Sequence, residues 1–138
     1  MTYGPRIAPG VAAGVTEDMI AELVRAFYAD VRRDPRLGPI FDRAIGAGWD
    51  AHLAKLCDFW SSVLLMTGRF KGSPMTAHAQ ISDIGPADFA VWLHLFGQVA
   101  ERLCPPPAAA LFVAKAAMIA QSLQLGIAHR RGELPAAL

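Results

Sequence analysis

Residues 16–33 read TEDMIAELVRAFYADVRR, and their pattern is that of an amphipathic helix. Thr16 can cap the helix, and the acids Glu17 and Asp18 lie where the helix dipole favours negative charge. The proline that follows Asp34 keeps that residue out of the helical conformation, so we expect the helix to end at about Arg33. Within it the large apolar side chains recur at helical spacing and predict one buried stripe: Ile20, Leu23, Val24, Phe27 and Val31.

Helical spacing continues along the rest of the chain. It predicts helices over 39–45, 49–66, 74–81, from 86 onward, and over about 108–125 after a run of prolines. No segment alternates as a strand does, so the predicted fold class is all-α. The 138 residues fit one domain over 1–138. We expect its ends, 1–15 and 131–138, to be mobile.

Composition excludes several classes of protein. Hydrophobic residues make up 54% of the chain and charged residues 18%, which excludes intrinsic disorder and implies an apolar interior. The formal net charge of +1 lacks the basic excess of nucleic-acid-binding proteins, so we expect no nucleic-acid partner. The charge-free runs are too short to cross a bilayer, and the N-terminus is a poor secretory signal. We therefore expect a cytoplasmic protein without membrane insertion.

The cysteines and histidines form none of the common metal or redox motifs. Cys57 and Cys104 belong to no CxxC pair, so we interpret them as buried, inert thiols. The histidines form no HExxH, HxxxH or CxxCH motif, which removes the sequence support for a zinc hydrolase or a covalently attached haem. They are His52, His78, His94 and His129.

Two histidines lie where a flat apolar cofactor would need them. Such a cofactor requires an imidazole on one face, a polar group on the other and walls of large apolar side chains. His52 lies on the aromatic face of the 49–66 helix and His78 on the 74–81 segment. Each also has a plainer interpretation, His52 as a hydrogen-bonded core histidine and His78 as an exposed loop residue. Ordinary core packing likewise accounts for the aromatic residues Tyr28, Phe41, Trp49, Phe59, Trp60, Trp92 and Phe96.

The order of the motifs is more specific than any of them alone. Phe27-Tyr28, DPRLGPIF over 34–41 and Trp49-x-x-His52-x-x-Lys55 resemble the opening of the group III, or P-type, truncated haemoglobins. The resemblance continues with DFWSSVLL over 58–65, TGRFKG over 67–72, PMxxH over 74–78, FxxWLxLF over 89–96 and AxSLQ over 120–124. Together these motifs extend over residues 16–127.

The resemblance implies a truncated globin fold, a two-over-two helical sandwich around one noncovalent haem b (iron protoporphyrin IX) per chain. His78 takes the place of the proximal iron ligand. The places of the distal residues, which face a bound gas, are taken by Tyr28, His52 and Trp92. The remaining candidates for contact with the haem are Phe41, Lys55, Phe59, Trp60, Arg69, Phe70 and Phe96.

Four residues concern the haem propionates. Lys55 stands where the family places a basic group near a propionate, and Arg69 and Lys71 are weaker candidates for the same role. Phe70 stands where relatives often have a tyrosine, so a hydroxyl that would contact a propionate is missing.

The implied function is binding of O2, CO, NO, cyanide or peroxide at a five-coordinate, His-ligated iron. Dense distal donors favour a redox or NO and peroxide detoxification role over O2 transport, with an unidentified reductant as partner. Whether the chain is a peroxidase-like or NO dioxygenase-like enzyme stays open. The alternatives are a cofactor-free helical adaptor that binds other proteins, and a single-domain gas sensor. The physiological ligand, the ferric sixth ligand, the oligomeric state and the choice between gating and hydrogen bonding by His52 also stay open.

Overall fold

The computed structural model describes residues 8–71 and 84–130, with side chains as far as 127. The predicted 74–81 helix, His78 and the end at 131–138 lie outside these residues. The described helices are α1 (Pro9–Ala12), α2 (Glu17–Arg33), α3 (Leu37–Ile45), α4 (Trp49–Leu65), α6 (Pro86–Leu103) and α7 (Pro106–Arg130). No strand occurs within the described residues, and the all-α prediction is confirmed.

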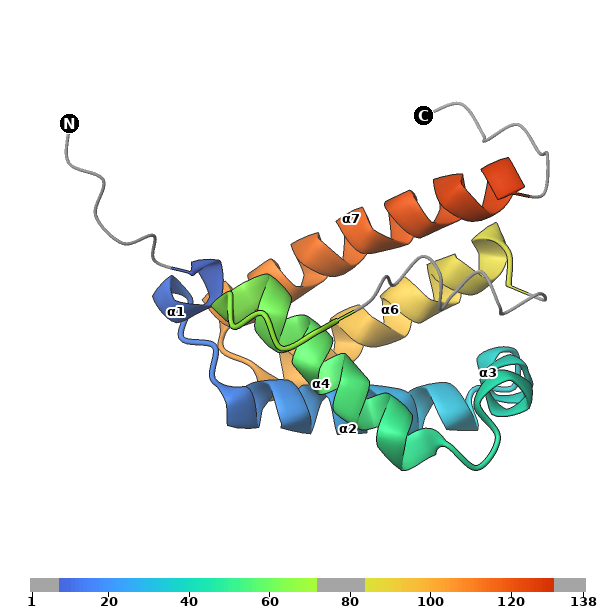
Figure 1. Cartoon of the computed structure of the whole chain (residues 1–138), viewed down its shortest axis with the longest axis horizontal. Coiled ribbons are helices and arrows are strands. Elements are labelled where there is room, and N and C mark those ends of the chain that lie inside the picture. Colours follow the sequence, from blue (N-terminus) through green and yellow to red (C-terminus); the bar gives the residue numbers. More distant parts are fainter. Residues whose placement is uncertain (1–7, 72–83, 131–138) are drawn as a thin grey trace.

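The helices form two pairs (Figure 1). Helices α6 and α7 run side by side, while α4 crosses α2 on the other side of the molecule. Helix α2 also packs on α6 and on the short α3, so it connects the two pairs. This arrangement confirms the predicted two-over-two sandwich.

Helix α2 agrees with its prediction at both ends. The Thr16 hydroxyl oxygen accepts the backbone N–H of Met19 at 3.1 Å, and Asp34 leaves the helix with extended backbone. Every residue of the predicted stripe is buried, and so is Tyr28 beside it. Each such apolar side chain contributes about 1.5–3 kcal/mol by leaving water, so this face fixes α2 against the rest of the fold.

Helix α3 begins at Leu37, two residues before its predicted start at Pro39. The reason is Asp34, whose Oδ1 accepts the backbone N–H groups of Arg36 at 2.8 Å and Leu37 at 2.9 Å. Gly38 allows the close approach of α3 to α2, because a Cβ there would lie 2.5 Å from the carbonyl oxygen of Arg32.

Helix α6 begins with Pro86, as predicted, and is fixed by the buried carboxylate of Asp88. Its Oδ2 accepts the backbone N–H of Gly85 at 2.8 Å, and its Oδ1 pairs with Arg36 Nε at 2.5 Å. These contacts set where α6 starts, and therefore where Trp92 lies, six residues after Pro86.

Helix α7 is longer than predicted at both ends. It starts inside the proline run, because proline is tolerated in the first turn of a helix, and it continues past Leu125. By length and composition Pro106–Ile127 would suffice to cross a membrane, although a core helix of a soluble protein passes the same test. The prediction from sequence considered only charge-free runs, so it did not detect this segment, which Lys115 interrupts. One side of the helix is buried against the fold through Phe112, Ala116 and Leu123.

The segment before α2 contains α1, for which the sequence predicted no element. Helix α1 packs on α4, and a Cβ at Gly10 would lie 2.7 Å from the carbonyl oxygen of Leu64. The two cysteines are free thiols, Cys104 buried and Cys57 half-buried. Burial raises the pKa of both thiols, as their interpretation as inert groups requires.

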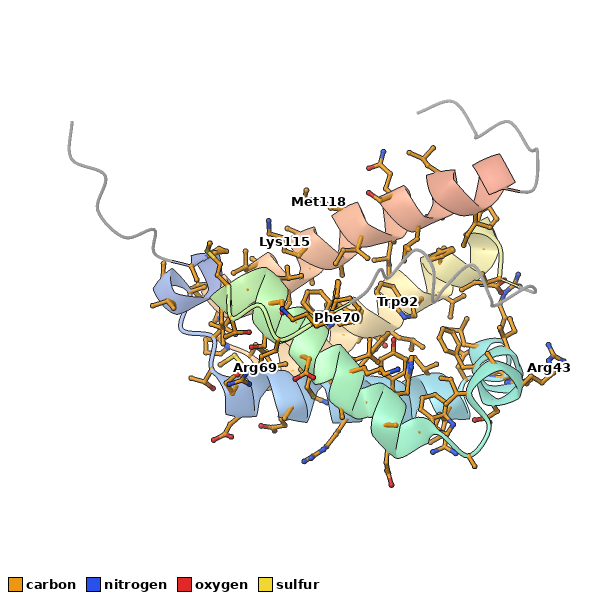
Figure 2. All side chains as sticks on the ribbon, viewed as in Figure 1. Arg43, Arg69, Phe70, Trp92, Lys115 and Met118 are labelled. Atoms are coloured by element: carbon orange, nitrogen blue, oxygen red, sulfur yellow. The ribbon has the colours of Figure 1, made fainter. Side chains whose placement is uncertain are left out.

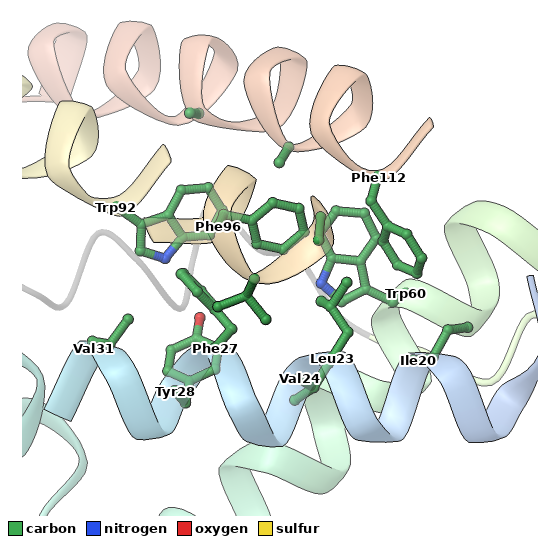
Figure 3. Close-up of a cluster of buried hydrophobic side chains, with 14 of the residues drawn as sticks. Ile20, Leu23, Val24, Phe27, Tyr28, Val31, Trp60, Trp92, Phe96 and Phe112 are labelled. Carbon is green, nitrogen blue, oxygen red and sulfur yellow. The ribbon is translucent and has the colours of Figure 1, made fainter. Parts of the chain in front are cut away.

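A continuous row of aromatic rings joins the helices in the core (Figure 3). The Phe96 ring stacks on Trp92 at 5.7 Å and on Trp60 at 5.4 Å between ring centroids. Phe27 of α2 meets Trp92 edge to face at 5.3 Å, and Phe112 of α7 lies 5.5 Å from Trp60. All of these rings except Phe112 line the cavity described next.

Candidate functional site

A cavity lies between α2, α4 and α6, and α7 contributes part of its floor. Its enclosed void is about 90 Å³, and the atom-free space including the open side is about 870 Å³. The cavity is lined by Tyr28, Phe41, His52, Lys55, Phe59, Trp60, Phe70, Trp92 and Phe96. These are the predicted site residues except Arg69 and His78.

Tyr28 and Trp92 are in direct contact at one end of this cavity. The indole N–H of Trp92 donates a hydrogen bond to the Tyr28 hydroxyl, and Figure 3 shows the two polar atoms facing each other. Burial raises the pKa of Tyr28 to about 12, and the indole hydrogen bond offsets part of that rise. The phenol is therefore neutral at physiological pH. Because its oxygen accepts from Trp92, its own hydrogen is directed toward another acceptor.

His52 completes this end of the cavity as part of a triangle of rings. The His52 ring lies 5.7 Å from Tyr28 and 5.8 Å from Trp49, and Tyr28 lies 5.9 Å from Trp49. Trp49 is held from outside, because its indole N–H donates to Asp42 Oδ1 at 3.0 Å and the Arg32 guanidinium lies 4.6 Å above its ring. Sequence reasoning treated Trp49 only as core, although its place one turn before His52 put it next to the site.

The opposite end of the cavity is built from Phe59 and Phe70. The two phenylalanine rings meet edge to face at 5.3 Å, and the exposed Lys55 stands at the rim. Arg69 does not line the cavity. Its guanidinium, a weaker candidate for a propionate contact, forms an ion pair with Glu17 at the start of α2 instead. Lys71 is exposed and is also absent from the lining.

Sequence reasoning missed several apolar residues that line the cavity. One of its candidates, His78, lies outside the described part of the chain. The additional residues are Leu23, Val24, Phe27, Leu56, Ile84, Phe89, Ile119 and Leu123. Helical spacing identified Leu23, Val24 and Phe27 as buried, but spacing does not distinguish a cavity wall from ordinary core. His78 lies outside the described residues, so its role as iron ligand stays a prediction.

The chemistry of the lining fits a haem. Aromatic and aliphatic side chains make up most of the surface, and the neutral donors gather at one end with a lysine at the open rim. The void of about 90 Å³ is smaller than the range of about 300–1,000 Å³ common for small-molecule sites, so the fit rests on the chemistry of the lining and not on its volume. A flat apolar ring with two acidic groups at one edge matches this distribution of apolar, polar and cationic side chains.

Comparison with known proteins identifies relatives of one kind. No family model matches the chain. Over 113 residues the chain is 34% identical to a group 3 truncated hemoglobin of Campylobacter jejuni, covering 80% of this chain and 89% of that protein. The crystal structure of group III truncated hemoglobin from Campylobacter jejuni matches with a TM-score of 0.76 and 34% identity, over 80% of this chain and 89% of that one.

Proposed function

The chain belongs to the group III truncated haemoglobins, and from that premise we propose that it holds one noncovalent haem b and binds O2 and other small ligands. The observation that carries the proposal is the aromatic cavity between α2, α4 and α6, with Tyr28 and Trp92 hydrogen-bonded at its end. A haem bound there supplies an iron atom that, with one imidazole ligand, can take up a diatomic gas or a small anion.

The residues of the cavity have distinct roles in this proposal. His78, which lies outside the described residues, would hold the iron, and Lys55 would pair with a propionate at the rim. Aromatic side chains pack the porphyrin and exclude water: Phe41, Phe59, Trp60, Phe70 and Phe96. A dry pocket strengthens the hydrogen bonds made inside it, because the local dielectric is low.

Tyr28 is the group that distinguishes polar ligands. With its pKa at about 12 the phenol keeps its proton at physiological pH, so it can donate to a ligand oxygen that carries partial negative charge. The Trp92 N–H that donates to the Tyr28 oxygen polarises the O–H bond and makes it a better donor. His52 either adds a further hydrogen bond or moves to open a path from solvent.

Strong retention of a polar ligand favours a reaction of the bound ligand over its reversible transport. A protein that releases O2 slowly is poorly suited to transport, so we assign the site a redox role or the detoxification of NO or peroxide. This role requires a reductant, and we place the protein in the cytoplasm.

Absorption spectroscopy of the purified protein tests the proposal. We expect a Soret band in the ferric and ferrous forms that shifts when CO is added, with one haem per chain. Extraction with acidified butanone is expected to remove the haem, since no covalent bond holds it. A chain that shows no Soret band even after addition of hemin would overturn the proposal and favour the cofactor-free adaptor.

A further inference from the structure

The chain reverses direction after α4 and returns along it. Met66 and Gly68 both have left-handed backbone, with φ of 57° and 70°, and this turn brings residues 66–70 back against the last turns of α4. We call residues 66–70 the strap. Figure 2 shows its last two side chains, Arg69 near the start of α2 and Phe70 among the side chains between α4 and α6.

Ser62 fixes the end of the strap. Its hydroxyl oxygen accepts the backbone N–H of Phe70 at 2.8 Å and donates its own hydrogen to the carbonyl oxygen of Asp58 at 2.9 Å. A single hydroxyl therefore connects the end of the strap to α4. Both contacts are made through the backbone of the partners, so they depend on residue 62 having a hydroxyl and not on the identity of the partner side chains.

A second cluster fixes the start of the strap. The Thr67 and Ser61 hydroxyl oxygens lie 2.7 Å apart, and Ser61 lies 3.1 Å from Glu17 Oε2. Glu17 also pairs with Arg69. Because Glu17 is the acceptor, Ser61 donates to it and Thr67 donates to Ser61. Ser61 is only 1% exposed, and a hydroxyl that is so deeply buried requires such partners.

These contacts decide where the Phe70 ring lies. The ring meets Phe59 at 5.3 Å and lines the cavity, yet it extends from a segment without helical hydrogen bonds. Among the described residues, Phe70 therefore belongs to no helix. Its position depends on the strap.

We propose that Ser62 is a positioning residue that holds Phe70 as a wall of the cavity and thereby prolongs the residence of the cofactor. The inference rests on the proposed function, since it concerns the retention of the haem. Ser62 contacts Phe70 only through the backbone N–H, so its effect on the cofactor passes through the Phe70 ring. A net hydrogen bond of ordinary strength corresponds to a change of about two- to tenfold in the rate of haem loss.

The test measures haem transfer from the loaded full-length chain to an excess of a high-affinity acceptor globin. Ser62→Ala is compared with Ser62→Thr, which keeps the hydroxyl, and with Ser122→Ala, which makes the same kind of change at an exposed position of α7. We expect Ser62→Ala to release haem about two- to tenfold faster than the wild type. We expect Ser62→Thr and Ser122→Ala to stay close to the wild-type rate.

A double variant separates positioning from general destabilisation. If Ser62 acts through Phe70, adding Ser62→Ala to Phe70→Ala produces no further acceleration. An unchanged rate for Ser62→Ala would overturn the inference, and so would an acceleration that is equally large in the Phe70→Ala background. The haem band of the wild-type chain is scored first and reports on the proposed function itself. Its absence would overturn both proposals, whereas ratios between variants bear on Ser62 alone.

Discussion

At the Tyr28 end of the cavity, side chains project from three regular helices, whereas at the Phe70 end one wall belongs to a loop. Tyr28, His52 and Trp92, which form the polar end, come from α2, α4 and α6. Phe59 and Phe70, which form the strap end, come from α4 and the strap. The polar end is thus fixed by the packing of the core, and the strap end by a few hydrogen bonds. We infer that the first governs ligand chemistry and the second governs retention of the cofactor.

Truncation of one phenylalanine at each end is expected to give the largest contrast. Phe41 lies beside the polar end and is 1% exposed, and its ring centroid is 6.1 Å from that of Tyr28. Phe41→Ala is expected to lower the free energy of unfolding by about 3–5 kcal/mol, because it removes a fully buried ring. Because Phe70 is only half-buried, Phe70→Ala is expected to lower the free energy of unfolding by about 1–2 kcal/mol. Guanidinium denaturation measures both, and equal costs would contradict the contrast between the two ends.

The pH dependence of stability isolates Tyr28. Its pKa is raised from 10.0 to about 12 in the folded chain, so above pH 10 the unfolded chain loses the phenol proton first. The resulting stability is fully present below pH 10 and is lost as pH rises toward 12, by about 3 kcal/mol in total. Unfolding free energies between pH 9 and pH 12 are compared in the wild type and Tyr28→Phe. Parallel curves for the two proteins would show that the buried phenol does not cause the loss.

Ligand release is expected to respond to the polar end alone. A hydrogen bond to a charged or nearly charged acceptor is worth roughly 1–3 kcal/mol, so Tyr28→Phe is expected to raise the O2 dissociation rate about tenfold or more. Trp92→Phe is expected to have a smaller effect, because its N–H donates to Tyr28. CO release is expected to change less than O2 release, since bound CO is less polar.

Stopped-flow ligand replacement measures these rates, with Ser62→Ala as the control from the strap end. O2 and CO rates that change equally would mean that Tyr28 acts only through packing. His52→Ala is the companion variant, and a gating role predicts faster association of the ligand.

The smallest effect is expected at the rim. Lys55 is exposed, and an exposed ion pair contributes about 0–1 kcal/mol. Lys55→Ala is therefore expected to speed haem loss by a factor of about five at most, and less at high salt because ions screen the pair. Ser62→Ala differs in this respect, since a hydrogen bond between neutral groups has little salt dependence. A Lys55→Ala rate equal to the wild-type rate at low and high salt would argue against a propionate contact.

The contrast between the two ends also describes what sequence could predict. The residues of the polar end could be predicted because α2, α4 and α6 have strong helical periodicity. This periodicity places Tyr28, His52 and Trp92 on inner faces. The strap end could not be predicted, because its contacts join residues that are distant in sequence. Arg69 pairs with Glu17, 52 residues earlier, and nothing in the local pattern indicates that pairing.

The ends of the helices show the same limit on a smaller scale. The start of α3 depends on hydrogen bonds that the Asp34 side chain accepts, and α1 depends on the fit of Gly10 against α4. Both are tertiary or side-chain effects that outweigh local propensity. The lining of the cavity was predictable as buried surface, but its roles toward haem came from the family resemblance and stay predictions.

Haem binding in this cavity is tested most directly by His78→Gly. We expect the variant to lose tight haem retention and to recover it when imidazole is added, because the free imidazole replaces the missing ligand. His94→Ala, at an exposed position of α6, serves as the control and is expected to bind haem like the wild type. An unchanged Soret spectrum and haem affinity in His78→Gly without imidazole would contradict the assignment of the iron ligand.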